Sequence, residues 1–332
     1  MKKIKLLVLC MLIFVIGGCG SKKVKEKELT NVSIVLDWYP NAIHSLFYVA
    51  MEKGYFEDEG IKLDIKYPAN VSDPIALPAA GKADFGLFYP QQMIMAKTQE
   101  DIPIVAIGAL TQGPLNVVVA PKETGITRPR DLEGKTIGYS DGPLTEDILK
   151  TMVAEDGGDI SKVKVLDVGF DLLSSMITKR VDATLGCFVN HEVPVMKEKG
   201  VDVNYFYPTD FGVPYYNELL IVANSKKVKE NRKLYIGFLR ACEKGFRDVK
   251  NNPKEALDIL LANQEADQFP LTRGIEKQSL ETLIPIMEKD NAPFLDQKEE
   301  MWEENIEWLY DKKITNKKIN ANDMFINLYK EI

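Results

Sequence analysis

The sequence predicts an α/β protein of two lobes with a ligand cleft between them. Short β-branched and apolar runs alternate with helical segments, a βαβ rhythm typical of a largely parallel sheet flanked by helices. The rhythm restarts after Pro121, which indicates two sheets rather than one. The 332 residues are 45% hydrophobic and 27% charged, which is enough for two sizeable cores.

The first lobe begins with a β-branched run. We expect its strands at residues 32–36, 61–67, 85–88 and 104–110, and its helices at 42–53, 74–80 and 91–98. Two of these helices are followed by Gly54 and Gly81, and glycine is favoured just past a helix end.

The second lobe repeats the pattern. We expect strands at 135–139, 163–168 and 183–188 and helices at 144–154 and 172–178. The apolar segments 117–120 and 219–224 are expected to carry the two crossings between lobes. The predicted first lobe is therefore 31–118 plus 224–332, and residues 119–223 form an inserted second lobe. A small ligand commonly binds at such an interface.

The tail from Ser225 onward is predicted to be helical. Asn252, Pro253 and Glu255 indicate a helix start with a capping box. Trp302 and Trp308 are interpreted as packing residues, and nothing in the tail points to chemistry. One apolar face repeats at helical spacing: Leu234, Phe238, Leu239, Cys242 and Phe246.

The first 18 residues are predicted to be a signal peptide. Three lysines precede an apolar stretch at 6–16, which is shorter than the roughly 20 residues that a membrane-spanning helix needs. IGGC at 16–19 resembles the bacterial lipobox. That resemblance implies a lipid on Cys19, a tether over 19–30 and a location on the extracytoplasmic face of the cell membrane. An ordinary signal peptide with a chance cysteine is the alternative.

Composition excludes several classes of protein. The net charge is −7, and removing Lys2, Lys3 and Lys5 with the signal peptide makes it −10, which disfavours nucleic acid as a partner. Cys10 is removed with the signal peptide and Cys19 is the predicted lipid site, so Cys187 and Cys242 remain, and two cysteines suggest no disulfide framework. The two histidines lack metal-ligand spacing. We expect a monomer with no metal and no cofactor.

The first candidate ligand contact is Trp38, between the first strand and the first helix. Ligands bind outside the carboxyl ends of strands in open α/β sheets, and a tryptophan there can stack on a flat ligand. Packing of Trp38 and Tyr39 at the lobe edge is the alternative. Asn41 is interpreted as a helix cap.

Several motifs resemble the thiamine-precursor branch of periplasmic-type binding proteins: DWYPN at 37–41 with His44, YVA at 48–50, KGYF at 53–56 and EGI at 59–61. GKADFG at 81–86 and DLEGKTIG at 131–138 look like the same superfamily. The resemblance covers most of the mature chain up to about Asn224 and is greatest to the formylaminopyrimidine-binding proteins of ABC importers.

That resemblance implies a type II periplasmic-binding-protein fold and a permease and ATPase complex as partners. It also implies that the ligand is N-formyl-4-amino-5-aminomethyl-2-methylpyrimidine, which is salvaged for thiamine biosynthesis. The free aminopyrimidine and thiamine fit the same residues.

The second candidate segment, GCFVNHE at 186–192, follows a strand of the second lobe. Glu192 is predicted to read the ring nitrogen and exocyclic amine of an aminopyrimidine, as the resemblance implies and as a bidentate carboxyl group can do. Capping of a helix that begins near Pro194 is the alternative. Cys187 and Asn190 are also predicted ligand contacts, whereas His191 is interpreted as a surface or structural residue.

Further contacts are expected on three turns. Tyr89 supplies a second aromatic wall, and Asn116 offers a donor and an acceptor to an amide. Ser140, Gly142 and Thr145 lie in a strand-to-helix turn whose N–H groups suit an anion or a carbonyl oxygen. Residues 215–218 are expected to contact either the ligand or only the second crossing between the lobes, at 219–224.

Two other functions compete with transport of a pyrimidine. One is a receptor for a sulfonate, taurine or another small organic solute, which favours the turn at 140–145 over Glu192. The other is an enzyme, because eukaryotic pyrimidine synthases share this fold and resemble residues 38–44. Those enzymes carry a cysteine-rich iron motif, whereas residues 186–192 hold one cysteine. The export signal also places this chain outside the cytosol, so we predict a binding protein.

Overall fold

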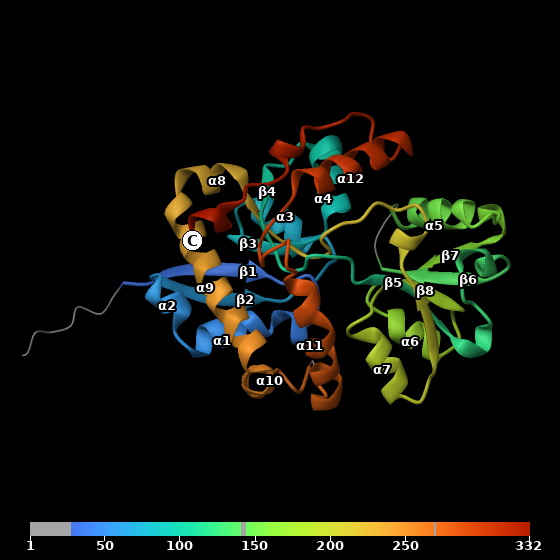
Figure 1. Cartoon of the computed structure of the whole chain (residues 1–332), viewed down its shortest axis with the longest axis horizontal. Helices are drawn as coiled ribbons and strands as arrows, with labels where there is room; N and C mark the ends of the chain where they lie inside the picture. The colour runs from blue at the N-terminus through green and yellow to red at the C-terminus, as the bar shows by residue number, and fades with distance from the viewer. Residues whose placement is uncertain (1–27, 141–143, 269) are drawn as a thin grey trace, which may run out of the picture.

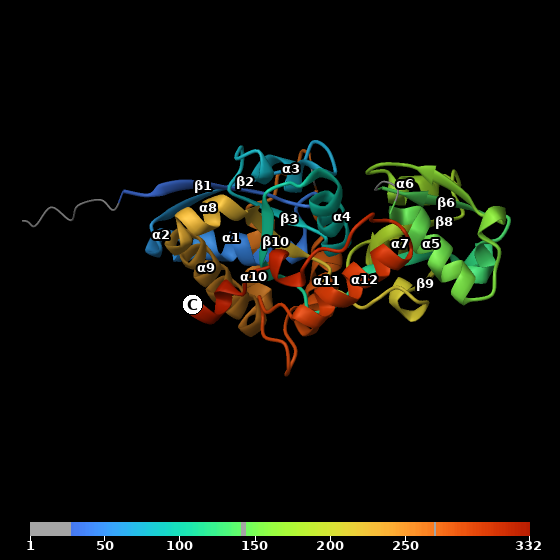
Figure 2. The same cartoon turned by 90° about the horizontal axis from the view of Figure 1, so that it is seen from above.

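Two α/β lobes lie side by side in the structure (Figures 1 and 2). A computed structural model describes residues 28–140, 144–268 and 270–332. The predicted signal peptide, Cys19 and most of the tether lie outside the described residues, as does Gly142. Within the described ranges, no helix combines the length and the apolar character needed to cross a membrane.

The first lobe contains a five-stranded sheet. Its strands are β1 (Thr30–Val35), β2 (Ile61–Lys66), β3 (Phe85–Phe88), β4 (Ile104–Ala109) and β10 (Leu220–Asn224). They lie in the order β2-β1-β3-β10-β4. β1 is parallel to both β2 and β3, whereas β10 is antiparallel to β3 and β4.

The second lobe contains another five-stranded sheet, in the order 7-6-8-5-9. Its strands are β5 (Asn116–Pro121), β6 (Thr136–Tyr139), β7 (Lys164–Asp167), β8 (Ala183–Phe188) and β9 (Val203–Phe206). The sequence pattern missed β9, because this short edge strand buries only its last residue and so has no continuous apolar run.

Four of the five strands in each sheet run in the same direction, which agrees with the predicted largely parallel sheets, but one antiparallel strand makes each sheet mixed. In each sheet a single strand, β5 or β10, runs against the other four. These are the strands that follow the two crossings. The parallel strands run toward the cleft, so a strand that enters its lobe from the cleft must run in the opposite direction.

The lobe boundaries also differ from the prediction. β5 belongs to the second sheet from Asn116 onward, and β10 belongs to the first sheet from Leu220 onward. The predicted limits at 118/119 and 223/224 therefore lie a few residues too late. Both strands are continuous apolar runs that fit either sheet, so hydrophobicity alone does not assign them.

Helices cover both faces of each sheet (Figure 1). In the first lobe, α1 and α9 contribute to the core on one face, and α3 and α4 to the core on the other. In the second lobe, α5 lies opposite α6 and α7. The helices are α1 (Ser45–Glu52), α2 (Tyr55–Asp58), α3 (Asp73–Ala79), α4 (Pro90–Glu100), α5 (Leu144–Glu155), α6 (Leu172–Ile177), α7 (Glu192–Glu198), α8 (Ser225–Glu230), α9 (Arg232–Asn251), α10 (Pro253–Ala262), α11 (Arg273–Met287) and α12 (Glu299–Asp311).

Two predicted helix starts take a different local form. The helix expected from residue 42 opens with a 3₁₀ turn, η1 (Ala42–His44), before α1. At α10, the Asn252 side chain accepts the Glu255 N–H at 3.3 Å, which confirms the predicted cap. The Glu255 carboxylate instead contacts the Asn252 side-chain amide and Lys53. It does not accept the Asn252 backbone N–H, so the second hydrogen bond of the predicted capping box is absent.

The GKADFG segment holds the central strands together. The Asp84 carboxylate accepts the Ser33 N–H at 2.9 Å, which ties the start of β3 to β1. At Gly86, the backbone of β3 approaches α3 so closely that a Cβ atom would overlap the Pro74 carbonyl oxygen. Glycine therefore sets the spacing between this strand and this helix.

Gly86→Ala should destabilise the first lobe. Forcing a methyl group into a packed interior costs about 1–3 kcal/mol, because β3 and α3 must separate. Urea unfolding would measure the change in the free energy of unfolding. Gly274→Ala on α11 is the matched control, since no atom lies within 4 Å of its added Cβ, and it should leave stability within about 1 kcal/mol of wild type. Equal effects of the two substitutions would refute the close approach.

Candidate functional site

A pocket with an empty volume of about 760 Å³, part of it open to solvent, lies between the two lobes. Most of its walls follow the carboxyl ends of β1, β3, β6 and β8, as expected for open α/β sheets. Its lining residues are Asp37, Trp38, Asn41, Tyr89, Gln92, Asn116, Ser140, Leu144, Thr145, Ile148, Leu172, Leu185, Gly186, Phe188, His191, Glu192 and Glu218.

The structure brings together most of the side chains that the sequence singled out. The predicted contacts that line the pocket are Trp38, Tyr89, Asn116, Ser140, Thr145 and Glu192. Gly142 lies outside the described residues.

Cys187 and Asn190 do not line the pocket, and their prediction as ligand contacts is corrected. Leu185, Gly186 and Phe188 of β8 line the pocket, whereas the Cys187 thiol is 0% exposed in the core, 3.2 Å from Thr184 Oγ1. Burial raises the pKa of this thiol well above its usual range. Asn190 is 1% exposed, and its amide donates to Ser279 Oγ of α11 at 2.9 Å.

Aromatic side chains from the two lobes meet beside the pocket. The ring centroids of Trp38 and Phe170 lie 4.5 Å apart, and those of Tyr89 and Phe188 lie 6.2 Å apart in an edge-on arrangement. Trp38 and Tyr89 belong to the first lobe, and Phe170 and Phe188 to the second. The partly buried Trp38 ring keeps a surface toward the pocket on which a flat ligand can stack.

The loop after β1 is held by hydrogen bonds around His44. The Asn41 N–H donates to His44 Nδ1 at 3.1 Å, so the ring proton resides on Nε2 and is donated to Asp37 Oδ1 at 2.9 Å. The Tyr89 hydroxyl donates to the other oxygen, Oδ2, at 3.1 Å. Asn41 also caps η1 as predicted, and its side chain lines the pocket as well.

A bulge interrupts β8 shortly before the segment that leads to Glu192. Val117 pairs with Cys187 and Val118 with Leu185, so Gly186 is skipped in the register with β5. Its φ of +116° favours glycine. The Gly186 N–H donates to Asn116 Oδ1 at 3.0 Å, so this predicted ligand acceptor already has a protein donor.

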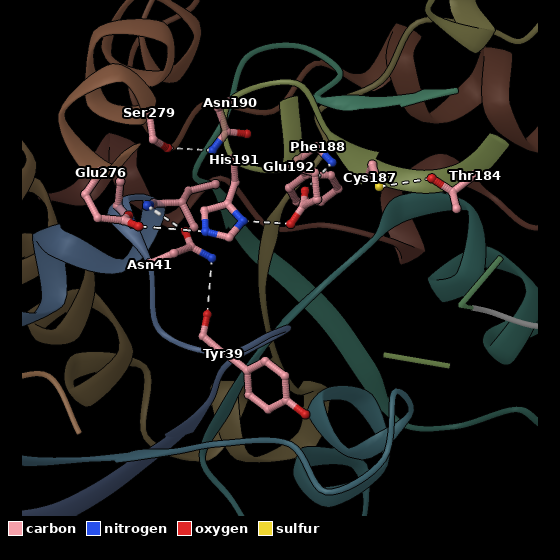
Figure 3. A network of polar contacts seen from close by, with 12 residues as sticks. Tyr39, Asn41, Thr184, Cys187, Phe188, Asn190, His191, Glu192, Glu276 and Ser279 are labelled. Atoms are coloured by element: carbon pink, nitrogen blue, oxygen red, sulfur yellow. Dashed lines mark hydrogen bonds and ion pairs between the residues drawn. The ribbon is translucent and has the colours of Figure 1, made fainter. Parts of the chain in front are cut away.

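Glu192 is the first residue of α7 and takes part in a network that crosses between the lobes (Figure 3). Its Oε2 accepts the Phe188 N–H at 2.7 Å, and its Oε1 lies 2.7 Å from His191 Nδ1. On the other side, His191 Nε2 lies 3.7 Å from Glu276 Oε1 on α11. Burial alone would lower the pKa of His191, but Glu192 and Glu276 raise it to about 9.

Glu218 joins the two connections between the lobes. Its Oε2 accepts the N–H groups of Leu115 and Asn116, both at 2.8 Å. Burial raises the pKa of Glu218 to about 7, although these two N–H groups act in the opposite direction and the nearby Asp37 adds to the rise. The prediction for residues 215–218 left contact with ligand or with the crossing open, and the structure places Glu218 at both the connection and the pocket wall.

The sequence reasoning missed the contacts of four of these residues. Asp37 lay inside the DWYPN motif, but no pattern linked it to His44. His191 was interpreted as a surface or structural residue, yet it is 19% exposed by side chain and lines the pocket. Phe170 and Glu276 had no signal in the sequence, because their partners are distant in the chain.

The pocket is rich in hydrogen-bond acceptors. Three carboxylates, Asp37, Glu192 and Glu218, line it, and no lysine or arginine is present among the described lining residues. Such walls suit a flat ligand that offers N–H donors or a positive charge. The described residues include no group of three or more His, Cys, Asp or Glu side chains placed to hold a metal ion.

The chain has two α/β lobes that share one pocket, and two connecting segments join them. This arrangement defines the periplasmic-binding-protein fold of solute-binding proteins. This chain belongs to the NMT1/THI5-like family, whose model matches residues 41–256.

Known proteins resemble the chain to different extents. The formylaminopyrimidine-binding protein of Halalkalibacterium halodurans is 41% identical over 99% of both chains. A 4-amino-5-hydroxymethyl-2-methylpyrimidine phosphate synthase of Legionella pneumophila is 27% identical over 76% of this chain and 79% of its own. The alkanesulfonate-binding protein of Xanthomonas axonopodis, solved with MOPS, superposes with a TM-score of 0.71 over 90% of this chain and 99% of its own, at 11% identity. The last likeness shows the fold alone.

The His191 ion pair predicts a loss of stability at alkaline pH. Its folded-state pKa of about 9 exceeds the ~6.5 of an ordinary histidine, so its contribution is complete below about pH 6.5 and is lost as the pH rises through 9. Between pH 7.5 and 9.5, wild type should lose about 1–2 kcal/mol more than His191→Gln in urea unfolding. Identical pH slopes would rule out the charged histidine.

Proposed function

We propose that this protein is the solute-binding component of an ABC importer and that it binds N-formyl-4-amino-5-aminomethyl-2-methylpyrimidine. The observation that carries the proposal is the acceptor-rich, aromatic wall of the pocket, without lysine or arginine among its described residues. The 41% identity to a formylaminopyrimidine-binding protein over 99% of both chains supports the same ligand.

An aminopyrimidine matches these walls. Its flat ring stacks on Trp38, its exocyclic amine donates to one Glu192 oxygen, and its ring nitrogen, in the protonated form, donates to the other. Each Glu192 oxygen already has one protein partner, but a carboxylate offers about four lone-pair sites, so both oxygens can accept again. The protein partners then hold the carboxylate in one orientation for the ligand.

A sulfonate fits the pocket poorly. Its anionic head would lie beside the Asp37 and Glu192 carboxylates, and His191 is the one positively charged side chain among the described lining residues. The charge of His191 is already balanced by Glu192, 2.7 Å from Nδ1, and by Glu276, 3.7 Å from Nε2. Like charges in a partly closed pocket repel, which disfavours this ligand class.

Binding rather than catalysis is also proposed. Some relatives in the family are named as synthases, but the segment at 186–192 has a single cysteine, whose thiol is 0% exposed and away from the pocket. A thiol in that position cannot reach a ligand or act as a nucleophile on it.

Calorimetry should detect one-to-one binding of the formylated aminopyrimidine to the chain from Ser21 onward, with a change in Trp38 fluorescence. Trp302 and Trp308 are buried in the core, so Trp38→Phe should remove the signal. Glu192→Gln should weaken binding by about 1–3 kcal/mol, because a charge-assisted acceptor is lost. Glu198→Gln is the matched control, because Glu198 is exposed at the end of the same helix, and it should leave the affinity for the pyrimidine unchanged.

The titration also tests the alternatives. Binding of taurine or an alkanesulfonate without binding of the pyrimidine would refute the ligand while leaving a transport receptor intact. Unchanged affinity of Glu192→Gln would remove Glu192 from the ligand site.

We further propose that Cys19 carries a lipid that holds the protein on the extracytoplasmic face of the membrane, beside the permease. The support is the apolar stretch at 6–16 followed by IGGC and a polar tether. In bacteria expressing the full chain, palmitate label and membrane fractionation should follow the protein and be lost in Cys19→Ser. Cys242→Ser serves as the control. Label retained in Cys19→Ser would refute the anchor.

A further inference from the structure

Helix α11 brings the C-terminal tail to the ligand site (Figure 3). The tail is part of the first lobe, and the family match ends at residue 256, before this helix. Glu276 on α11 is nevertheless 1% exposed and lies between pocket segments of both lobes. A buried carboxylate needs partners, and the partners of Glu276 define its role.

Glu276 contacts both sides of the cleft. Its Oε2 accepts the Ala42 N–H at 2.7 Å, in the turn that follows the Trp38 loop. Its Oε1 lies 3.7 Å from His191 Nε2 of the second lobe. One helical turn later, Ser279 Oγ accepts from the Asn190 amide at 2.9 Å, so the same face of α11 contacts the second lobe twice.

We propose that Glu276 is a positioning residue of the ligand site that acts through His191 on Glu192. The path is continuous: Glu276 faces one ring nitrogen of His191, and Glu192 faces the other at 2.7 Å. The contact with Glu192 orients the imidazole ring through Nδ1, and the Glu276 carboxylate favours the charged form of the ring from the Nε2 side. The ring in turn holds Glu192 Oε1, while the Phe188 N–H holds Oε2. This role rests on the proposed contact between Glu192 and the ligand.

Few charged groups surround His191 and Glu276. Glu192 and Glu276 are the charged groups that act on His191, and burial alone would lower its pKa. Burial and the nearby Glu192 raise the pKa of Glu276, whereas His191 and the Ala42 N–H lower it. Removing the Glu276 charge should therefore change the protonation of His191, which a role limited to anchoring Ala42 would not do.

A mutant cycle tests the path. In otherwise unchanged protein, Glu276→Gln should weaken binding of the formylated aminopyrimidine between about 2-fold and 30-fold. In a His191→Gln background the same substitution should change affinity less than about 2-fold, because the path is already broken. Glu281→Gln, an exposed acid on the same helix, is the charge-matched control. Equal losses in both backgrounds would show that Glu276 acts through Ala42, and would overturn the proposal.

A histidine titration tests the path without ligand. The chain has two histidines, so nuclear magnetic resonance can follow each ring, with His191→Gln assigning the signals. Glu276→Gln should shift the His191 midpoint to lower pH, and Glu281→Gln should not. An unmoved midpoint in a folded Glu276→Gln protein, judged by its melting curve, overturns the proposal. Failure of wild type to bind the pyrimidine would instead refute the proposed ligand, and the titration would still decide the link between Glu276 and His191.

Discussion

The arrangement of the lobes depends on two connecting segments, and one carboxylate fastens them together. Glu218 on the second connection accepts the N–H groups of Leu115 and Asn116 where the first connection becomes β5. Because β5 pairs with β8, this contact fixes the strand whose end leads to Glu192. Burying the Glu218 carboxylate costs free energy, and its pKa is accordingly raised to about 7. A ligand that brings N–H donors to this wall would offset that cost.

The pocket carboxylates are oriented before any ligand arrives. Asp37 accepts from His44 and Tyr89, and Glu192 accepts from the Phe188 N–H and pairs with His191. These partners are fixed by the fold, so the remaining lone pairs point in set directions and less freedom is lost on binding. Selectivity follows from the same arrangement, because acceptors that are already negative favour donors and repel anions.

Periodicity in the sequence predicted most strands and helices because the buried elements are continuous apolar runs. It did not predict the direction of β5 or β10, since hydrophobicity carries no information on strand direction. The candidate site was predicted where residues follow strands, as with Trp38, Tyr89 and Glu192. Cys187 was misplaced because proximity in sequence to pocket residues does not decide which face of β8 a side chain occupies, and the bulge at Gly186 breaks the alternation along this strand.

Glu276 shows how a site residue in the tail could have been recognised. Its helix buries Ile275, Ser279, Leu280 and Leu283, and Glu276 falls on that same face. A charged residue on a buried face requires a partner from another element. It therefore indicates a functional contact more strongly than an acid on a solvated face does. The partner here comes from the inserted lobe. The tail that follows the βαβ units therefore does more than complete the first lobe, because α11 forms part of the contact between the lobes beside the pocket.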